Sequence, residues 1–317
     1  MLASEPSRAP NDAVFDRRLL VVTGKGGVGK STVAAALAWR AARAGKRVLA
    51  CELEPTGDLG AALAGAAGAS PIGRGTHYEP DELYPRLWVM AMDPEASLKE
   101  YLKLNLRIPF LTKVGALSNV FDFLANAAPG VREIVTIGKV AWEVKERHYD
   151  LVVVDATASG HVVGLLRAPE AINELVGAGM IRGQTAWMLD VLRRGETTGV
   201  VVVTTAEELP VNETLSLCKE LPTATGTHLA AVVVNRVLAP AEATTLERLV
   251  RAGVKTKTAK ILNEATRIAA ARWDAQQEQM ARLEQLVPAH TEVRTVPLVI
   301  DSSSGLPITK AVAEALS

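Results

Sequence analysis

The chain lacks several features that mark large classes of protein. Its 317 residues include only two cysteines, Cys51 and Cys218, which are too few for a disulfide framework and fit a reducing compartment. Lysine plus arginine and aspartate plus glutamate both number 35, and this balance argues against a nucleic-acid partner. No apolar run reaches the roughly 20 residues of a membrane-spanning helix. We therefore expect a cytoplasmic protein with no integral membrane segment.

Strands and helices alternate along most of the chain. Residues 1–17 lack the apolar centre of a secretory signal, and we expect them to form a flexible tail. Buried strands are predicted from short β-branched runs at 19–23, 47–52, 87–92, 151–156, 199–205, 230–236 and 293–299. Helical stretches between them predict an α/β fold with a doubly wound, mainly parallel sheet and helices on both faces. Three helical insertions, at about 96–147, 168–198 and 241–287, predict an added helical layer.

The strongest chemical motif directly follows the first predicted strand. The segment from Gly24 to Ser31, GKGGVGKS, fits the P-loop pattern G-x-x-x-x-G-K-[ST] between a strand and a helix, as that motif requires. Its glycines let backbone N–H groups turn toward phosphate oxygens at a helix N-terminus. We expect Lys30 to reach the β- and γ-phosphates of a nucleotide and the Ser31 hydroxyl to bind Mg²⁺. The predicted nucleotide-binding residues of the loop are Gly24, Lys25, Gly26, Gly27, Val28, Gly29, Lys30, Ser31 and Thr32.

A carboxylate at the end of a second strand completes the predicted metal site. Asp155 follows four apolar residues in LVVVDA, and open α/β sheets bind their ligands at such strand ends. An aspartate in this position can also simply cap a turn. Together with the phosphate loop, Asp155 is predicted to hold the Mg²⁺ ion through a water molecule.

The extra lysine of the loop, Lys25, indicates a family. The segment KGGVGKS resembles the deviant Walker A loop of dimeric ATPases such as MinD, ParA, the nitrogenase iron protein and the ArsA-like anion-transporting ATPases. In those families the first lysine crosses the dimer interface to the partner's nucleotide. A cation supplied in trans can raise a rate by ~10³–10⁵, by analogy with arginine fingers. The resemblance thus implies a catalytic Lys25 and an ATP-closed dimer, either a homodimer or a heterodimer with a paralogous ATPase.

Other segments narrow the resemblance to ArsA-like and tail-anchored-protein-targeting ATPases. CELEPTGDLGAAL, residues 51–63, is similar to their first switch, and DATASGHVVGLLRAP, residues 155–169, to their second. VVVNR resembles the strand that ends in their adenine-recognising asparagine, here Asn235, and VPLVIDSSSG resembles the adenine loop, with Pro297. APGVREIVTIGKVAWEV is similar to actinobacterial ArsA-like members. The resemblance spans roughly residues 18–315 and implies that 18–317 form a single P-loop ATPase domain using ATP and Mg²⁺.

Both switches depart from the family pattern. Glu54 replaces the aspartate that polarises the attacking water, and its extra methylene displaces the carboxylate; a shift of about 1 Å can lower a rate ~10²-fold. Asp58 is the alternative catalytic carboxylate. In the second switch Ala158 replaces a proline, while Asp155, Gly160 and His161 are retained, and His161 is either a switch residue or a turn histidine. We expect slow or partner-dependent hydrolysis, with switch residues Glu54, Asp155, Gly160 and His161.

The cargo is less clearly encoded. The two distant cysteines form no C-x-x-C motif, so we predict no zinc, and they are too few for an arsenite site of the family type. The segments 108–131 and 172–192 are apolar on most sides, which predicts either core packing or a groove for a hydrophobic protein or lipid-like client. Two hypotheses remain: a client-handling ATPase that reaches membranes transiently through a partner, and a weakly active or inactive subunit of a heterodimer. MinD-type membrane binding and ParA-type DNA partition rank lower, because the C-terminal segment holds one lysine and the chain is neutral.

Overall fold

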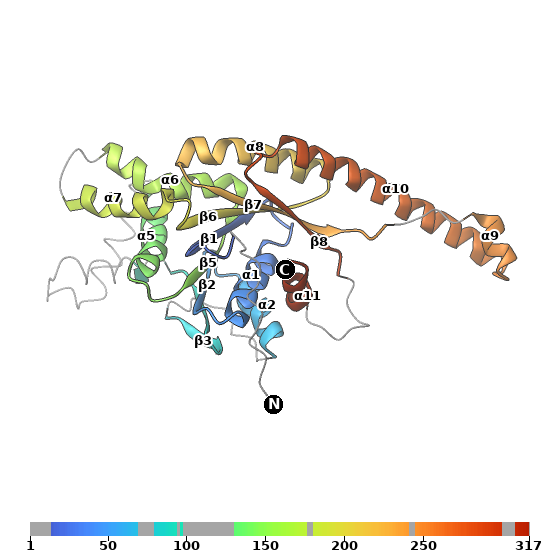
Figure 1. The fold of residues 1–317 in the computed structure, drawn as a ribbon, viewed down its shortest axis with the longest axis horizontal. Coiled ribbons are helices and arrows are strands. Elements are labelled where there is room, and N and C mark those ends of the chain that lie inside the picture. Colours follow the sequence, from blue (N-terminus) through green and yellow to red (C-terminus); the bar gives the residue numbers. More distant parts are fainter. Residues whose placement is uncertain are drawn as a thin grey trace, which may run out of the picture.

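An eight-stranded sheet forms the centre of the protein (Figure 1). The structure, a computed structural model, describes residues 14–68, 79–93, 96–97, 130–175, 180–240, 245–299 and 308–316. The strand order is β3-β4-β2-β5-β1-β6-β7-β8, and every pair is parallel except β3 with β4. The predicted doubly wound, mainly parallel α/β fold is therefore confirmed. The strands are β1 (Leu19–Gly24), β2 (Val48–Glu52), β3 (Asp81–Tyr84), β4 (Leu87–Ala91), β5 (Leu151–Ala158), β6 (Thr198–Thr205), β7 (Leu229–Val237) and β8 (Glu292–Pro297).

Helices cover both faces of this sheet. Along β1, Leu20 and Val22 pack with α1, α2 and α11, whereas Leu19 and Val21 pack with α5, α6 and α8. This alternation follows from the two-residue period of a strand and explains why the central strands read as continuous apolar runs. The described helices are α1 (Lys30–Arg43), α2 (Asp58–Ala67), α5 (Val131–Lys145), α6 (Ser159–Leu175), α7 (Met180–Arg193), α8 (Glu208–Thr225), α9 (Leu246–Arg251), α10 (Thr256–Leu286) and α11 (Ile308–Ala315).

The strand β3 was not expected from the sequence. It contains four residues, none of them buried, and pairs antiparallel to β4 at the edge of the sheet. A short, exposed edge strand carries no apolar run, because only its partner strand packs into the core. The other seven strands lie at the predicted places.

Most of the predicted segment 108–131 lies outside the described residues, and the domain boundaries remain predictions. Of 172–192, α7 buries one face, with Thr185, Met188 and Leu192, while Ala186 and Asp190 are exposed. This helix therefore packs one face against the body and exposes the other face to solvent. In the described part of the chain, no helix is both long enough and apolar enough to cross a membrane.

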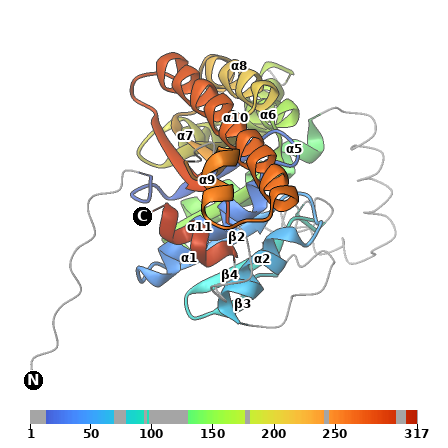
Figure 2. The ribbon, with the colours of Figure 1, turned by 90° about the vertical axis from the view of Figure 1, so that its right-hand side faces the viewer.

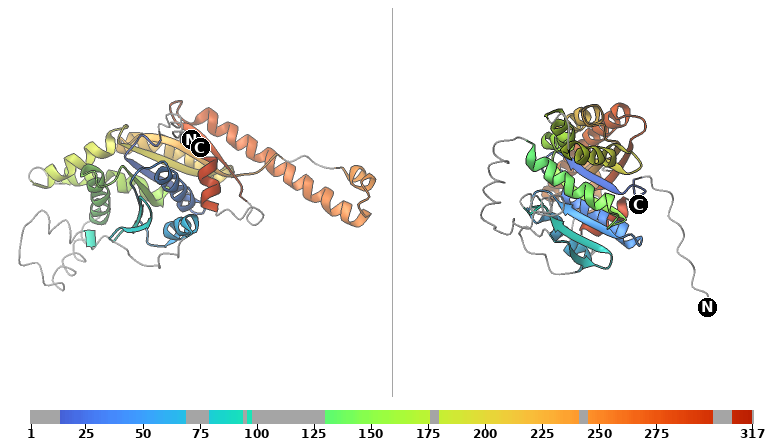
Figure 3. Two further views of the ribbon diagram at one scale, coloured as in Figure 1. Left: turned by 60° about the horizontal axis from the view of Figure 1, so that its bottom comes forward. Right: turned by 90° about the vertical axis from the view of Figure 1, so that its left-hand side faces the viewer.

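The long helix α10 gives the molecule its elongated outline. It runs for 31 residues, lies over the sheet at its C-terminal end, and extends well past the sheet at its N-terminal end (Figures 1 and 3). The short helix α9 packs at this distant end (Figure 2).

The residue at the end of β1, Gly24, accepts no side chain. Its φ is +148°, and a Cβ there would lie 2.1 Å from the carbonyl oxygen of Val203 on β6. Gly26, two residues later, has open space within 4 Å of a Cβ. The close approach of β1 and β6 therefore requires glycine at position 24 only.

We predict that Gly24→Ala lowers the free energy of unfolding by at least about 2 kcal/mol, because β1 and β6 must separate and the backbone is strained. Gly26→Ala is the matched control and should change it by less than about 1 kcal/mol. Urea denaturation without nucleotide measures both, and equal stabilities of the two variants would contradict the prediction.

Candidate functional site at the carboxyl ends of the strands

The predicted site residues gather at one edge of the sheet. Five neighbouring strands, β2, β5, β1, β6 and β7, run parallel and end there. Glu52 and Gly24 are the last residues of β2 and β1, and Asp155 and Asn235 lie in the carboxyl-terminal halves of β5 and β7. This is the edge at which open α/β sheets bind ligands.

The phosphate loop connects β1 to α1 and contacts the end of β7. Gly29 precedes the first residue of α1 with a φ of +95°, and a Cβ on it would lie 2.4 Å from Nδ2 of Asn235. The same Nδ2 donates a hydrogen bond of 2.9 Å to the carbonyl oxygen of Val28. Asn235, predicted from resemblance to bind adenine, is thus buried against the loop itself.

The two lysines of the loop have different surroundings. Nζ of Lys30 lies 3.5 Å from the carbonyl oxygen of Lys25, so the side chain of Lys30 turns back over the loop. Lys25 instead forms an ion pair with Glu213 on α8, and its side chain is 34% exposed. Lys30 therefore lies over the loop backbone, whereas Lys25 points toward α8 at the surface.

Asp155 is the least satisfied charged group of the site. Its carboxylate is buried and accepts a hydrogen bond from Ser31, while its Oδ1 has no hydrogen-bond partner among the residues that the structure describes. The pKa of Asp155 is raised to about 6, chiefly because the carboxyl group is buried; the hydrogen bond from Ser31 and the charge of Lys30 oppose this shift, whereas the charges of Glu52 and Asp58 add to it. A buried carboxylate with a free oxygen beside a serine hydroxyl suits a divalent cation, which prefers oxygen ligands.

Glu52 was missed by the sequence reasoning. It lies opposite Asp155 in the register of β2 and β5, and its carboxylate accepts hydrogen bonds from the Thr56 hydroxyl and from the backbone N–H groups of Gly57, Asp58 and Leu59. These bonds hold the start of α2. The pattern that identified Asp155, a carboxylate after a run of apolar strand residues, also occurs in RVLACE, residues 47–52, where the carboxylate is Glu52.

The predicted catalytic carboxylates lie in the loop that Glu52 organises. Glu54 is exposed, and its side chain contacts no hydrogen-bond or ion-pair partner among the described residues. Asp58 begins α2, is exposed, and accepts a hydrogen bond of 3.1 Å from the Thr56 hydroxyl. Of these two carboxylates, Asp58 is the one whose charge raises the pKa of Asp155.

The predicted second switch lies where β5 meets α6. Gly160 and His161 are exposed in the first turn of α6. Just before them, the buried Thr157 hydroxyl has no hydrogen-bond partner in the described part of the chain, and the carbonyl oxygen of Thr157 accepts a bond of 3.0 Å from the Thr23 hydroxyl. Thr157 is a second polar residue that the sequence reasoning did not select.

The remaining predicted residues lie farther along the chain. Pro297 ends β8 and is exposed, and residues 300–307 of its loop lie outside the described residues. Cys51 and Cys218 are both buried, on β2 and α8, and burial raises the pKa of both thiols, that of Cys218 to about 12. Such thiols are inert as metal ligands until deprotonated, and the absence of zinc stays a prediction.

The fold and this strand-end loop define a P-loop NTPase architecture. A family model described as "Anion-transporting ATPase" matches residues 17–194, more than half of the chain. The chain therefore belongs to the anion-transporting ATPase family, and the expected ArsA-like membership is confirmed.

Several known ATPases resemble part of the chain. The ATPase BagA of Mycobacterium tuberculosis and the putative ATPase Mb3704 of Mycobacterium bovis are each 32% identical to it over 225 residues, which is 69% of this chain and 65% of theirs. The ATPase get3 of the fungus Schizosaccharomyces japonicus is 29% identical over 155 residues, 49% of this chain and 45% of its own. The matched part thus spans just under two thirds of the mycobacterial relatives.

Without nucleotide and metal, we predict that Asp155→Asn stabilises the protein at pH 7. Because folding raises the pKa of Asp155 from 3.8 to about 6, its charged form disfavours the folded state, and stability falls as the pH rises through this range. Removing the charge should recover about 1–3 kcal/mol at pH 7 and little near pH 4. Urea denaturation at both pH values checks this, and a variant less stable than wild type at pH 7 would refute it.

Proposed function

We propose that the chain binds ATP with Mg²⁺ and hydrolyses the nucleotide as one half of a dimer. The observation that carries this proposal is the free, buried Oδ1 of Asp155 beside Ser31, at the end of a strand adjoining the phosphate loop. Backbone N–H groups of the loop and Lys30 would hold the phosphates, and Ser31 and Asp155 would hold the metal shell. The bound metal would neutralise phosphate charge.

The proposal assigns the other polar groups to positioning. Asn235 lies against the loop through Val28, so a base bound beside Asn235 is fixed relative to the phosphates. Glu52 holds the loop that carries Glu54 and Asp58, either of which would orient the attacking water. Gly160 and His161, exposed at the start of α6, would respond to the γ-phosphate as the second switch.

The dimer is proposed from the position of Lys25. Its ion pair with Glu213 lies at the surface, with side-chain exposures of 34% and 44%, and such exposed pairs contribute little stability. Lys25 is therefore available to exchange Glu213 for a phosphate of a second subunit, where a water-excluded interface strengthens the attraction. The partner is a second copy or a related ATPase.

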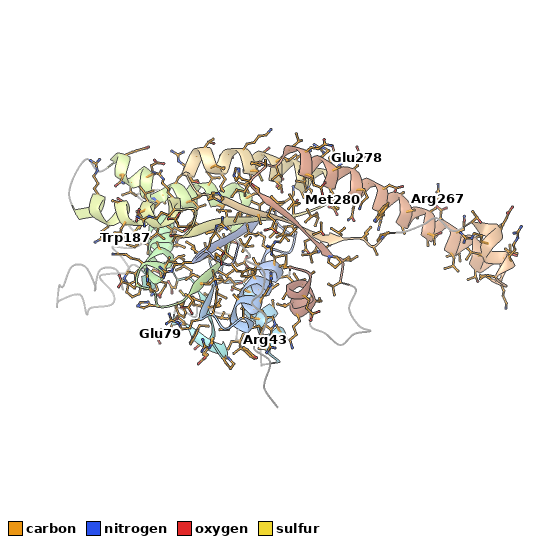
Figure 4. The ribbon with its side chains drawn as sticks, in the orientation of Figure 1. Arg43, Glu79, Trp187, Arg267, Glu278 and Met280 are labelled. Atoms are coloured by element: carbon orange, nitrogen blue, oxygen red, sulfur yellow. The ribbon has the colours of Figure 1, made fainter. Side chains whose placement is uncertain are left out.

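We further propose that the helices outside the sheet serve a hydrophobic client, either a membrane-protein segment or a lipid-like molecule. The half-buried Trp187 on α7 lies toward the outside of this layer, where Lys145 of α5 stacks on its ring at 4.7 Å (Figure 4). Mass spectrometry of material that copurifies with the protein tests this part; recovery of no apolar molecule or apolar protein segment would refute it.

A second candidate is a weakly active or inactive subunit of a heterodimer. The specific observation that favours it is the exposed Glu54 carboxylate, which has no partner among the described residues that would aim it at a water molecule. Turnover of the purified chain alone, compared with turnover after mixing with a related ATPase, separates the two candidates.

We predict that Lys30→Ala reduces ATP affinity by at least about 100-fold, because the loop backbone alone lacks the charge that holds the γ-phosphate. Isothermal calorimetry with Mg-ATP measures the affinity, and Lys219→Ala on α8 is the control that should bind as wild type does. An unchanged affinity of Lys30→Ala would refute the phosphate-loop assignment.

For Lys25 we predict a loss of turnover rather than of binding. Lys25→Ala should bind ATP within about threefold of wild type but lose about 10³-fold in turnover, by analogy with arginine fingers. Glu213→Gln is a matched control, since it breaks the same ion pair and keeps the lysine, and it should retain turnover.

Mixed dimers make the prediction for Lys25 sharper. Lys25→Ala in one subunit should slow hydrolysis in the unmutated subunit. Equal losses in Lys25→Ala and Glu213→Gln, or a collapse of ATP affinity in the Lys25→Ala chain itself, would show that the lysine acts within its own subunit.

A further inference from the structure

The far end of α10 is a projecting element that the proposed ATPase chemistry does not use. We define the distal arm as residues 245–275, which comprise α9 and the first part of α10 (Figures 1 and 3). Among its described side chains only Ala259 is buried. At about 1.5 Å per residue, the helical part from Thr256 onward extends for roughly 30 Å.

The rest of α10 holds this arm firmly on the body. Leu283 is buried in the core, and Nη2 of Arg282 donates a 2.8 Å hydrogen bond to Oδ1 of Asn212 on α8. Oε1 of Gln276 accepts a 2.8 Å bond from the backbone N–H of Leu238. Figure 4 shows Glu278 and Met280 over the body and Arg267 beyond it. The arm is therefore a rigid projection.

An exposed apolar stripe follows one face of the arm. Ile261 and Ile268 are 63% and 47% exposed and, seven residues apart, share a helix face with the exposed Ala265. Leu262, 41% exposed, borders the stripe, and Val250 on α9 is 46% exposed. Of the eight large hydrophobic side chains exposed in the described residues, four belong to this arm. Single exposed apolar residues are ordinary, but a contiguous patch indicates a contact surface.

The arm is also strongly basic in a chain of zero net charge. Residues 245–275 hold three acidic residues, Glu247, Glu264 and Asp274, and Glu264 pairs with Arg267 at 2.8 Å. Against these stand seven basic residues, Arg248, Arg251, Lys255, Lys257, Lys260, Arg267 and Arg272. The partner that fits must therefore combine negative charge with an apolar layer.

We propose that the distal arm docks on a membrane surface that contains anionic lipids. An apolar stripe flanked by lysines and arginines is the pattern of helices that lie in the headgroup region. The arm projects away from the body, so it can lie along a flat surface without a collision. A second copy fits less well, because two arms side by side would bring like charges together.

Vesicle sedimentation tests the proposal without nucleotide, so its outcome is independent of the ATPase assignment. The chain should sediment with vesicles of phosphatidylcholine containing 30% phosphatidylserine and stay in solution with pure phosphatidylcholine. Lys257→Gln should weaken binding about fivefold, as expected for one cation near such a surface. Raising the salt to about 1 M should release the protein, because the Debye length falls to about 3 Å.

Matched variants separate the arm from the rest of the surface. Ile268→Ser should weaken vesicle binding at least about fivefold, whereas Ile308→Ser on α11, at 46% exposure against 47%, should not. Lys219→Gln is the corresponding control for Lys257→Gln. Failure to bind anionic vesicles, or equal binding of all four variants, would overturn the proposal. So would a change of oligomeric state in Ile268→Ser with unchanged vesicle binding, which would make the stripe a subunit contact.

Discussion

The constraint on which the site depends is the convergence of negative charge at the ends of β2 and β5. The parallel register places Glu52 beside Asp155, in surroundings that exclude water. The two carboxylates differ in how many hydrogen-bond donors compensate them. Glu52 is compensated by four donors from the loop that follows it, whereas Asp155 keeps an oxygen without a partner and a raised pKa. A buried group left unsatisfied costs stability, so its presence at a strand end is best explained by a ligand that completes it.

A series of hydrogen bonds joins this site to the part of α10 that lies on the body. Asn235 bonds to Val28 in the phosphate loop, and its own Oδ1 accepts the backbone N–H of Arg236 at 2.9 Å. Gln276 of α10 then contacts both sides of the next turn, through the carbonyl oxygen of Arg236 and the N–H of Leu238. These hydrogen bonds connect the loop to α10, and the arm is the extension of that same helix.

Particular residues show how far the sequence could predict this arrangement. The apolar runs identified seven strands, most of them buried on both faces, and the GKGGVGKS pattern identified the loop, whose first glycine, Gly24, leaves no room for a side chain beside Val203. The exposed strand β3 was not predicted, because it forms by pairing with β4 and none of its residues is buried. Glu52 and Glu213 were not selected from the sequence for a related reason, since each matters through the residue that it faces. Glu52 faces Asp155, which is 103 positions away, and Glu213 faces Lys25, which is 188 positions away.

The sequence by itself determined the fold class, the phosphate loop and the strand that carries Asp155, because these depend on local periodicity and on the backbone freedom of glycine. Only the tertiary structure decided which carboxylates meet, that Asn235 supports the loop, that Lys25 pairs with Glu213, and that the helix from Thr256 continues past the body with an uncovered apolar face. The interaction between two charges and the exposure of a side chain depend on distances in space. The spacing of residues along the chain does not reveal how close two strand ends lie or where a helix extends beyond the elements that pack against it.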